Sequence, residues 1–187
     1  MTTPMARGWH THRRYAPAVI EVLPFAEAAA LLDGLQRGYR DVDDRPSPLV
    51  VIDLDRKPDD TGCALVSPGN LPVVLVGVSR TGGAPPEVAS AADILLAEDP
   101  AAPAPWVSAS ENVVGELARI EAATSSNPLA TTTLMQVLRA SDGLPAEAAL
   151  VLESLAYATL QAGPEHRAWL DLPGRPQPDD DGSAAVR

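Results

Sequence analysis

Short apolar runs, each bounded by turn-forming residues, recur through the first half of the chain. Runs of this length with apolar residues at consecutive positions predict strands that are buried on both faces. We expect such strands at 19–23, 49–54 and 73–78 and in the segment ADILLAED. Between the first two, apolar residues recur at helical spacing and predict an amphipathic helix from Phe25 to about Tyr39. The stretch 85–91 is Ala-rich and has the length of about two helical turns.

The pattern changes after the spacer AAPAPW, and residues up to Leu172 follow a helical period. Ser110 is expected to cap one helix, and prolines at the first helical turn open three more, at Pro128, Pro145 and Pro164. The residues expected on the buried faces are Val114, Leu117, Ala118 and Ile120, then Leu129, Thr133, Leu134, Val137 and Leu138, then Ala148, Val151, Leu152, Leu155 and Thr159.

The order of these elements predicts an α/β fold in one domain. We expect a mobile segment at 1–18, a single domain at 19–172 and a disordered tail at 173–187, because both ends lack core-forming residues. Within the domain, short buried strands and helices at 19–99 form the core and precede a helical part at 108–172.

Composition narrows the expected partners and compartment. The net charge of −11 repels phosphate backbones and anionic lipids, so neither nucleic acid nor a membrane is an expected partner. Cys63 is the single cysteine and cannot form an internal disulfide, which favours a reducing cytoplasm. The N-terminal apolar stretch is too short for an export signal, and the longest uncharged stretch is interrupted by Pro and Gly.

The most suggestive local feature is the glycine pair Gly82 and Gly83, which follows a predicted strand and precedes a predicted helix. Backbone amides in such a turn can approach an anion, although a plain structural turn explains the pair as well. The Lys and Ser/Thr of a phosphate loop are absent, and so is a complete GxGxxG. Asp53 and Asp55 end a predicted strand, where α/β sheets place ligand-binding groups, but acidic loop residues account for them equally.

Other titratable residues give weaker signals. His10 and His12 would converge on a metal or phosphate in an extended segment, yet an unstructured N-terminus is the simpler explanation. His166 is expected to face solvent. Cys63 has no neighbouring His or Lys in sequence to activate it as a nucleophile. No metal site and no metal cofactor are therefore expected.

Three segments resemble the crotonase superfamily, which includes enoyl-CoA hydratases and isomerases. LPVVLVGVS is similar to a family strand of the form PVIAAVNG, and EVASAADILLAED is similar to ELALACDIRIAAED. The stretch from SSNPLATTT to HRAWL resembles the final helices of the family, with Asn-Pro before an Ala and Gly-Leu before a Leu-rich helix. The segment from FAEAAALL to LVVIDLD matches the layout of the first family helix and strand. Together these segments span most of residues 24–171.

The resemblance implies a reduced spiral α/β core that binds an acyl-CoA thioester and stabilises an enolate with two backbone amides. Gly82 and Gly83 stand where the family has one of these amides. No residue matches the family's catalytic glutamates, and Glu87 is expected to move the proton because it lies near the glycine pair in the sequence. No cofactor is implied, and a coenzyme A thioester is the implied ligand. The chain departs from the family in two places: it lacks a pattern like FSAGAD after LVVIDLD, and the block that supplies catalytic glutamates is missing after ILLAED.

Three functions remain open. The first is an enoyl-CoA hydratase/isomerase-like protein that binds or transforms an acyl-CoA. The second is a catalytically inactive crotonase-like accessory subunit, working as a homo-oligomer or as a hetero-oligomer with another crotonase-like subunit. It would associate through an apolar face on the helices from 128 to 160. The third is an unrelated α/β binding module.

Overall fold

A parallel five-stranded sheet forms the centre of the computed structural model, which describes residues 20–38, 48–56, 69, 71–84, 86–109 and 112–172. The strands are β1 (Val22–Pro24), β2 (Leu49–Asp53), β3 (Val74–Ser79), β4 (Ile94–Ala97) and β5 (Val107–Ser108). The helices of the described part are α1 (Phe25–Gln36), α2 (Pro86–Ala89), α3 (Val113–Ser126), α4 (Pro128–Ser141), α5 (Ala146–Gln161) and α6 (Pro164–Leu170). The predicted α/β class is confirmed.

Both faces of the sheet are buried, which explains why its strands read as continuous apolar runs. Successive side chains of a strand point to opposite faces. Val50 and Ile52 of β2 therefore join one hydrophobic cluster with Leu75 of β3, while Val51 and Val76 join a second cluster on the other face. The bounds of β1 to β4 lie within about three residues of the strands predicted, whereas β5 was not predicted.

The strands of the sheet are arranged in the order in which they follow one another along the chain, from β1 to β5. Every neighbouring pair is parallel. The helices α1 and α2, which connect strands, contribute to the same cluster on one face, and so does Trp106 in the connection to β5. Connections on one face are what right-handed crossovers produce when each strand is added on the same side. Residues 57–68, between β2 and β3, lie outside the described residues.

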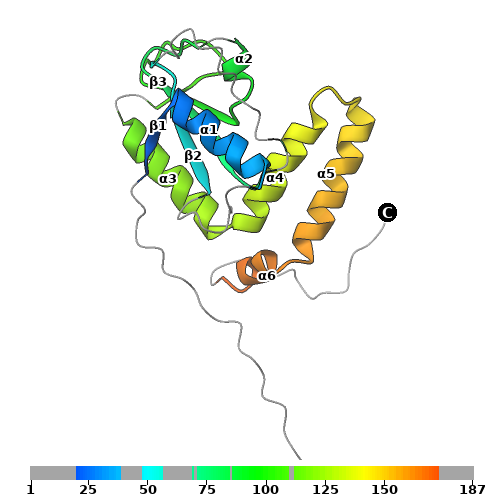
Figure 1. The fold of residues 1–187 in the computed structure, drawn as a ribbon. Coiled ribbons are helices and arrows are strands. Elements are labelled where there is room, and N and C mark those ends of the chain that lie inside the picture. Colours follow the sequence, from blue (N-terminus) through cyan, green and yellow to red (C-terminus); the bar gives the residue numbers. More distant parts are fainter. Residues whose placement is uncertain are drawn as a thin grey trace, which may run out of the picture.

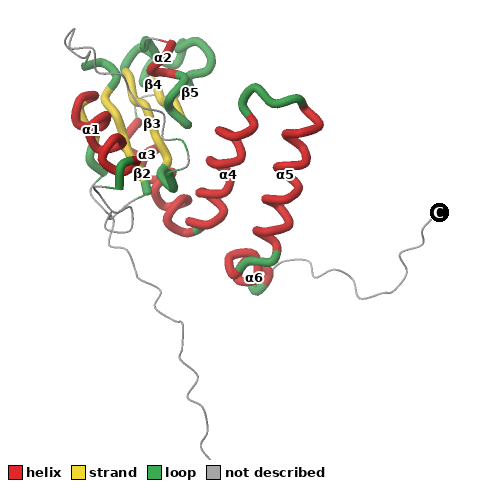
Figure 2. Tube along the Cα trace, turned by 45° about the vertical axis from the view of Figure 1, so that its right-hand side comes forward, coloured by secondary structure: helices red, strands yellow, loops and turns green. Residues whose placement is uncertain are grey.

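The helices that follow the sheet do not pack on the same face as α1 and α2. Leu117 of α3 is buried against the second face, and Met135 of α4 packs on the same cluster. α5 lies beyond α4, away from the sheet, and α6 lies at the foot of the α4–α5 hairpin (Figures 1 and 2). The Glu165 carboxylate of α6 accepts hydrogen bonds from the N–H groups of Leu129 (2.7 Å) and Ala130 (2.9 Å), which fastens α6 to the start of α4.

The ends of α1 and α3 differ from the prediction. α1 ends at Gln36, before the expected Tyr39, because Gly38 follows with a positive φ of 71°. α3 begins at Val113, and its cap is Asn112, whose side chain accepts a hydrogen bond from the Gly115 N–H (3.0 Å). The Ser110 cap was wrong; Ser110 lies outside the described residues.

Several helical residues predicted to be buried are exposed. Leu117 is buried as expected and Ile120 packs beside it. The residues predicted to be buried but found exposed are Val114 and Ala118 of α3, Leu129, Leu134 and Leu138 of α4, and Ala148, Val151, Leu155 and Thr159 of α5. Apolar residues occur on every side of these helices, so the period alone could not select the packed side. In addition, β5 was not predicted: it directly follows the spacer AAPAPW, where the part expected to be helical begins.

The predicted end segments 1–18 and 173–187 lie outside the described residues. Among the helices of the described part, none combines the length and the hydropathy needed to cross a membrane.

Candidate functional site

The glycine turn predicted as an anion site lies at the carboxyl edge of the sheet, directly after β3. Gly82 is buried and has a φ of +77°. Its N–H donates to the Ser79 hydroxyl oxygen (3.1 Å). A Cβ at this position would lie 2.7 Å from the Cβ of Ala102, so the turn requires glycine for both backbone conformation and space.

Asp55 fastens the end of β2 to this turn. The Ser79 hydroxyl donates to Asp55 Oδ1 (2.8 Å), while the backbone N–H and the Nε of Arg80 donate to Oδ2 (2.9 and 3.0 Å). Burial by itself raises the pKa of Asp55, but the hydrogen bonds from Arg80 and Ser79, together with the Arg80 charge, outweigh it and hold the pKa below its usual value. The carboxylate stays ionised at neutral pH and is a poor proton donor there.

The two predicted oxyanion donors are therefore adjacent but not equivalent. The Gly82 amide is engaged within the turn, whereas Gly83 is exposed and its N–H has no acceptor in the described part of the chain. Glu87 lies in α2, and its side chain lies outside the described residues, so its catalytic role stays a prediction. Of the two glycine amides, that of Gly83 is the one left without an acceptor among the described residues.

Asp53 also lies at the carboxyl edge, as expected. Its Oδ1 accepts the backbone N–H groups of Asp55 (3.0 Å) and Arg56 (3.3 Å), so this carboxylate shapes the turn after β2. In open α/β sheets the ligand crevice forms where the strand order reverses. The five described strands contain no such reversal. The sheet edge thus offers an isolated turn and no crevice of that kind.

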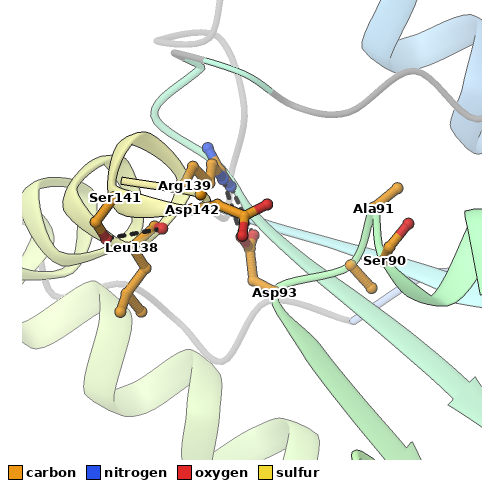
Figure 3. A pocket seen from close by; sticks show the side chains of 9 residues that line it. Ser90, Ala91, Asp93, Leu138, Arg139, Ser141 and Asp142 are labelled. Atoms are coloured by element: carbon orange, nitrogen blue, oxygen red, sulfur yellow. Dashed lines mark hydrogen bonds and ion pairs between the residues drawn. The ribbon is translucent and has the colours of Figure 1, made fainter. Parts of the chain in front are cut away.

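A buried ion pair that the sequence analysis missed joins α4 to the opposite edge of the sheet. The Arg139 and Asp93 side chains are 13% and 8% exposed, with Nε to Oδ1 at 2.9 Å and Nη2 to Oδ2 at 2.6 Å (Figure 3). Arg139 also donates to the carbonyl oxygens of Gly69 and Leu71 (both 3.0 Å) and Val73 (2.7 Å). These bonds tie α4 to the segments that enter β3 and β4.

The cavity beside this pair has a volume of about 370 Å³ and is lined by residues of the α2–β4 turn and of the end of α4 (Figure 3). All five guanidinium N–H donors of Arg139 are matched by five hydrogen bonds. The Leu75 N–H gives Asp93 a further donor (2.8 Å). The pair is saturated and acts as a structural anchor rather than a ligand site. One signal was available: Arg139 is the sole charged residue between 128 and 141.

The third candidate is a surface. We call the helices α4, α5 and α6 together the helical arm; none of their residues is fully buried. Its large hydrophobic residues that are exposed are Leu129, Leu134, Leu138, Leu144, Leu150, Val151, Leu155, Tyr157, Trp169 and Leu170. The principal contacts of α5 are with α4 and α6. The arm thus presents an extended apolar surface.

Few polar groups of α5 oppose the burial of its surface under a partner. Glu147 and Glu153 are its only charged residues. The hydroxyl of Ser154 donates to the carbonyl oxygen of Leu150 (2.7 Å), and that of Thr159 donates to Leu155 (2.8 Å). Burying either hydroxyl under a partner would leave no donor unsatisfied.

The remaining predicted residues do not assemble into a site. His166 stacks on Trp169, with ring centroids 5.6 Å apart, and its Nδ1 lies 3.1 Å from the Gln161 carbonyl oxygen. His10, His12 and Cys63 lie outside the described residues. Within the described part, no three His, Cys, Asp or Glu residues are grouped to hold a metal ion.

Comparisons of the chain with protein-family models, with curated proteins and with solved structures give no match.

Proposed function

We propose that the chain is a reduced, crotonase-like subunit that acts by protein–protein association through its helical arm rather than by hydration of an acyl-CoA. The strand order of the sheet, which follows the chain order, and the packing of α1 and α2 on one face are in keeping with a spiral core. The helices α3, α4, α5 and α6 all follow the last strand. This order is in keeping with the C-terminal helical region implied by the resemblance.

The observation that carries the proposal is the exposure of α5. Leu150, Val151 and Leu155 are 60%, 61% and 64% exposed, on a helix with apolar residues on every side. A helix of this kind is normally buried, and large exposed apolar patches mark interaction sites. Interfacial membrane helices carry Lys and Arg on their polar face, whereas α5 has only two glutamates as charged residues. A protein partner is therefore favoured over a lipid surface.

Two features of the glycine turn favour association over catalysis. The Gly82 amide is already hydrogen-bonded within the turn, and the loss of one oxyanion donor typically costs about 10² to 10³ in rate. Asp55, the carboxylate fastened to this turn, is held ionised by its hydrogen bonds, so it is poorly suited to deliver a proton.

To test the association, we would compare labelling of two introduced cysteines in cells that express the chain with Cys63→Ser. Leu155→Cys is expected to react with a permeant maleimide several-fold more slowly than Val114→Cys, because the arm is covered and Val114 is exposed on α3 (79%). Equal labelling in cells would overturn the proposal. So would protection that persists in a purified monomer, because the chain itself would then cover α5.

A second candidate function, acyl-CoA binding at the turn, is favoured by the exposed Gly83 amide. Titration of the purified chain with crotonyl-CoA and with free CoA, followed by a hydration assay, separates the two functions. We expect no turnover. Turnover that Glu87→Gln abolishes would establish a hydratase-like enzyme instead, whereas binding without turnover would indicate a retained acyl-CoA site without the chemistry.

A further inference from the structure

The three helices of the helical arm are each joined to the other two. α4 leads into α5 through residues 142–145, and α5 leads into α6 through residues 162–163. From α6, the Glu165 carboxylate reaches back to the first turn of α4, where it accepts the N–H groups of Leu129 (2.7 Å) and Ala130 (2.9 Å). The principal contacts of α5 are with α4 and α6 (Figure 2). The arm is therefore a closed set of helices.

The attachment of this arm to the sheet is narrow. In the described part of the chain, Met135 is the arm residue that packs on a hydrophobic cluster of the sheet. The other attachment is polar: the Arg139 guanidinium donates to the Asp93 carboxylate (Figure 3) and to three carbonyl oxygens of the segment that enters β3. Asn127 links the arm to α3 along the chain. Much of the docking of the arm on the sheet thus depends on one arginine.

The polar attachment is expected to break as a whole. The Arg139 and Asp93 side chains are both largely buried, so their separation requires water to enter the contact and solvate two charges. Three carbonyl oxygens lose their donor in the same step. None of the arm residues is fully buried, and helices take most of their stability from tertiary packing. Once separated from the sheet, the arm therefore has little left to keep its helices formed.

We propose that the helical arm opens from the sheet as one cooperative unit when Arg139 separates from Asp93, while the sheet stays folded. Regions with few buried apolar contacts open at a lower free energy than the core. Among the described residues, the cluster that joins α1 and α2 to the sheet includes no residue of α3 to α6, so it is intact after the arm has opened. The arm is thus a two-state element with its own equilibrium.

This equilibrium goes beyond the association function proposed above, because it exists in the purified chain whether or not a partner binds. A partner that binds the closed arm stabilises the closed state by mass action. Its apparent affinity also falls with the fraction of chains whose arm is closed. The Arg139–Asp93 pair would therefore control how much of the chain is competent to associate.

Hydrogen exchange of the purified full chain, followed by mass spectrometry of its peptides, tests this opening. Peptides of α4, α5 and α6 are expected to share one free energy of opening, and it should lie below that of peptides of β2 and β3. Arg139→Leu should speed exchange in all three arm helices by about 100-fold or more, since it removes one member of a buried ion pair. Arg139→Lys keeps the charge and should give a smaller acceleration in the same three helices.

A core variant on the other face of the sheet distinguishes the arm from the sheet. Ile52 of β2 is fully buried in the cluster that holds α1. Ile52→Val should speed exchange in β2 and β3 by about 2- to 10-fold and leave the arm unchanged, because this contact survives the opening of the arm. Arg119→Leu removes an exposed pair on α3 and is the matched control for Arg139→Leu. It should leave exchange in the arm nearly unchanged.

Two results would overturn the inference. If arm and strand peptides shared one free energy of opening, or if Ile52→Val accelerated both equally, the chain would open as one body. If the acceleration by Arg139→Leu and Arg139→Lys were confined to the last turn of α4, the ion pair would hold only that turn. No partner takes part in this experiment, so a failure of the association function in cells leaves the opening of the arm standing. An arm that does not open separately likewise leaves the association function intact.

Discussion

Arg139→Leu is expected to lower the free energy of unfolding by about 3–5 kcal/mol, the cost of leaving one member of a buried ion pair without its partner. Asp93 would remain 8% exposed with no cation beside it. The carbonyl oxygens of Gly69, Leu71 and Val73 would also lose their donor. Urea denaturation followed by circular dichroism measures the loss.

Arg119→Leu is the matched control for this prediction. Arg119 also pairs with a carboxylate on a helix, that of Glu116 at 3.0 Å, but its side chain is 78% exposed. Exposed pairs of this kind contribute about 0–1 kcal/mol. If the two variants lost the same free energy, the Arg139–Asp93 pair would not be the anchor between α4 and the sheet. Arg139→Lys should fall between them, because an ammonium retains the charge but not the planar fork that donates to five acceptors.

The core of this fold was predictable because it depends on local pattern. Strands buried on both faces require consecutive apolar residues, and β2, β3 and β4 carry them. The starts of α4 and α6 were equally clear, since Pro128 and Pro164 stand in their first turns. In these segments, the residues that specify the element are the residues of the element itself.

The packing of the helical arm could not be predicted in the same way. Leu152 was expected on the buried side of α5 and is partly buried, but Val151 and Leu155, from the same expected stripe, are exposed. α5 has apolar residues on every side, so its sequence indicates a buried helix but does not show which element covers it. The described contacts of the arm cover only part of its apolar surface. A partner protein, as proposed above, would account for the apolar residues that remain exposed.

In the candidate sites, too, local features could be predicted from the sequence and long-range contacts could not. The glycine turn was found from its position after a strand, but its hydrogen-bond partners were not. Asp55 reaches Ser79 across 24 residues, and Arg139 reaches Asp93 across 46. Such pairs depend on the tertiary arrangement of the sheet. The lone arginine in α4 was the clue to the second pair, because an isolated charge in an apolar helix usually has a buried partner.

Gly82→Ala is expected to destabilise the chain by about 1–3 kcal/mol more than Gly143→Ala, the usual cost of forcing an extra methyl group into a packed site. Gly82 and Gly143 have nearly the same backbone strain for any other residue, with φ of +77° and +73°. They differ in space: a Cβ at Gly82 meets Ala102 at 2.7 Å and Trp106 at 3.3 Å, whereas a Cβ at Gly143 meets nothing within 4 Å. The difference between the two unfolding free energies therefore isolates the packing of the turn.

The outcome also bears on what the turn is for. If Gly82→Ala is the costlier variant, glycine is required at 82 by the close approach of the segment before β5, and a site for an acyl thioester is not needed to explain it. Equal losses would mean that the Ala102–Trp106 segment moves aside readily. The turn would then be open enough for a ligand to approach the Gly83 amide, and acyl-CoA binding would become the stronger proposal for this edge of the sheet.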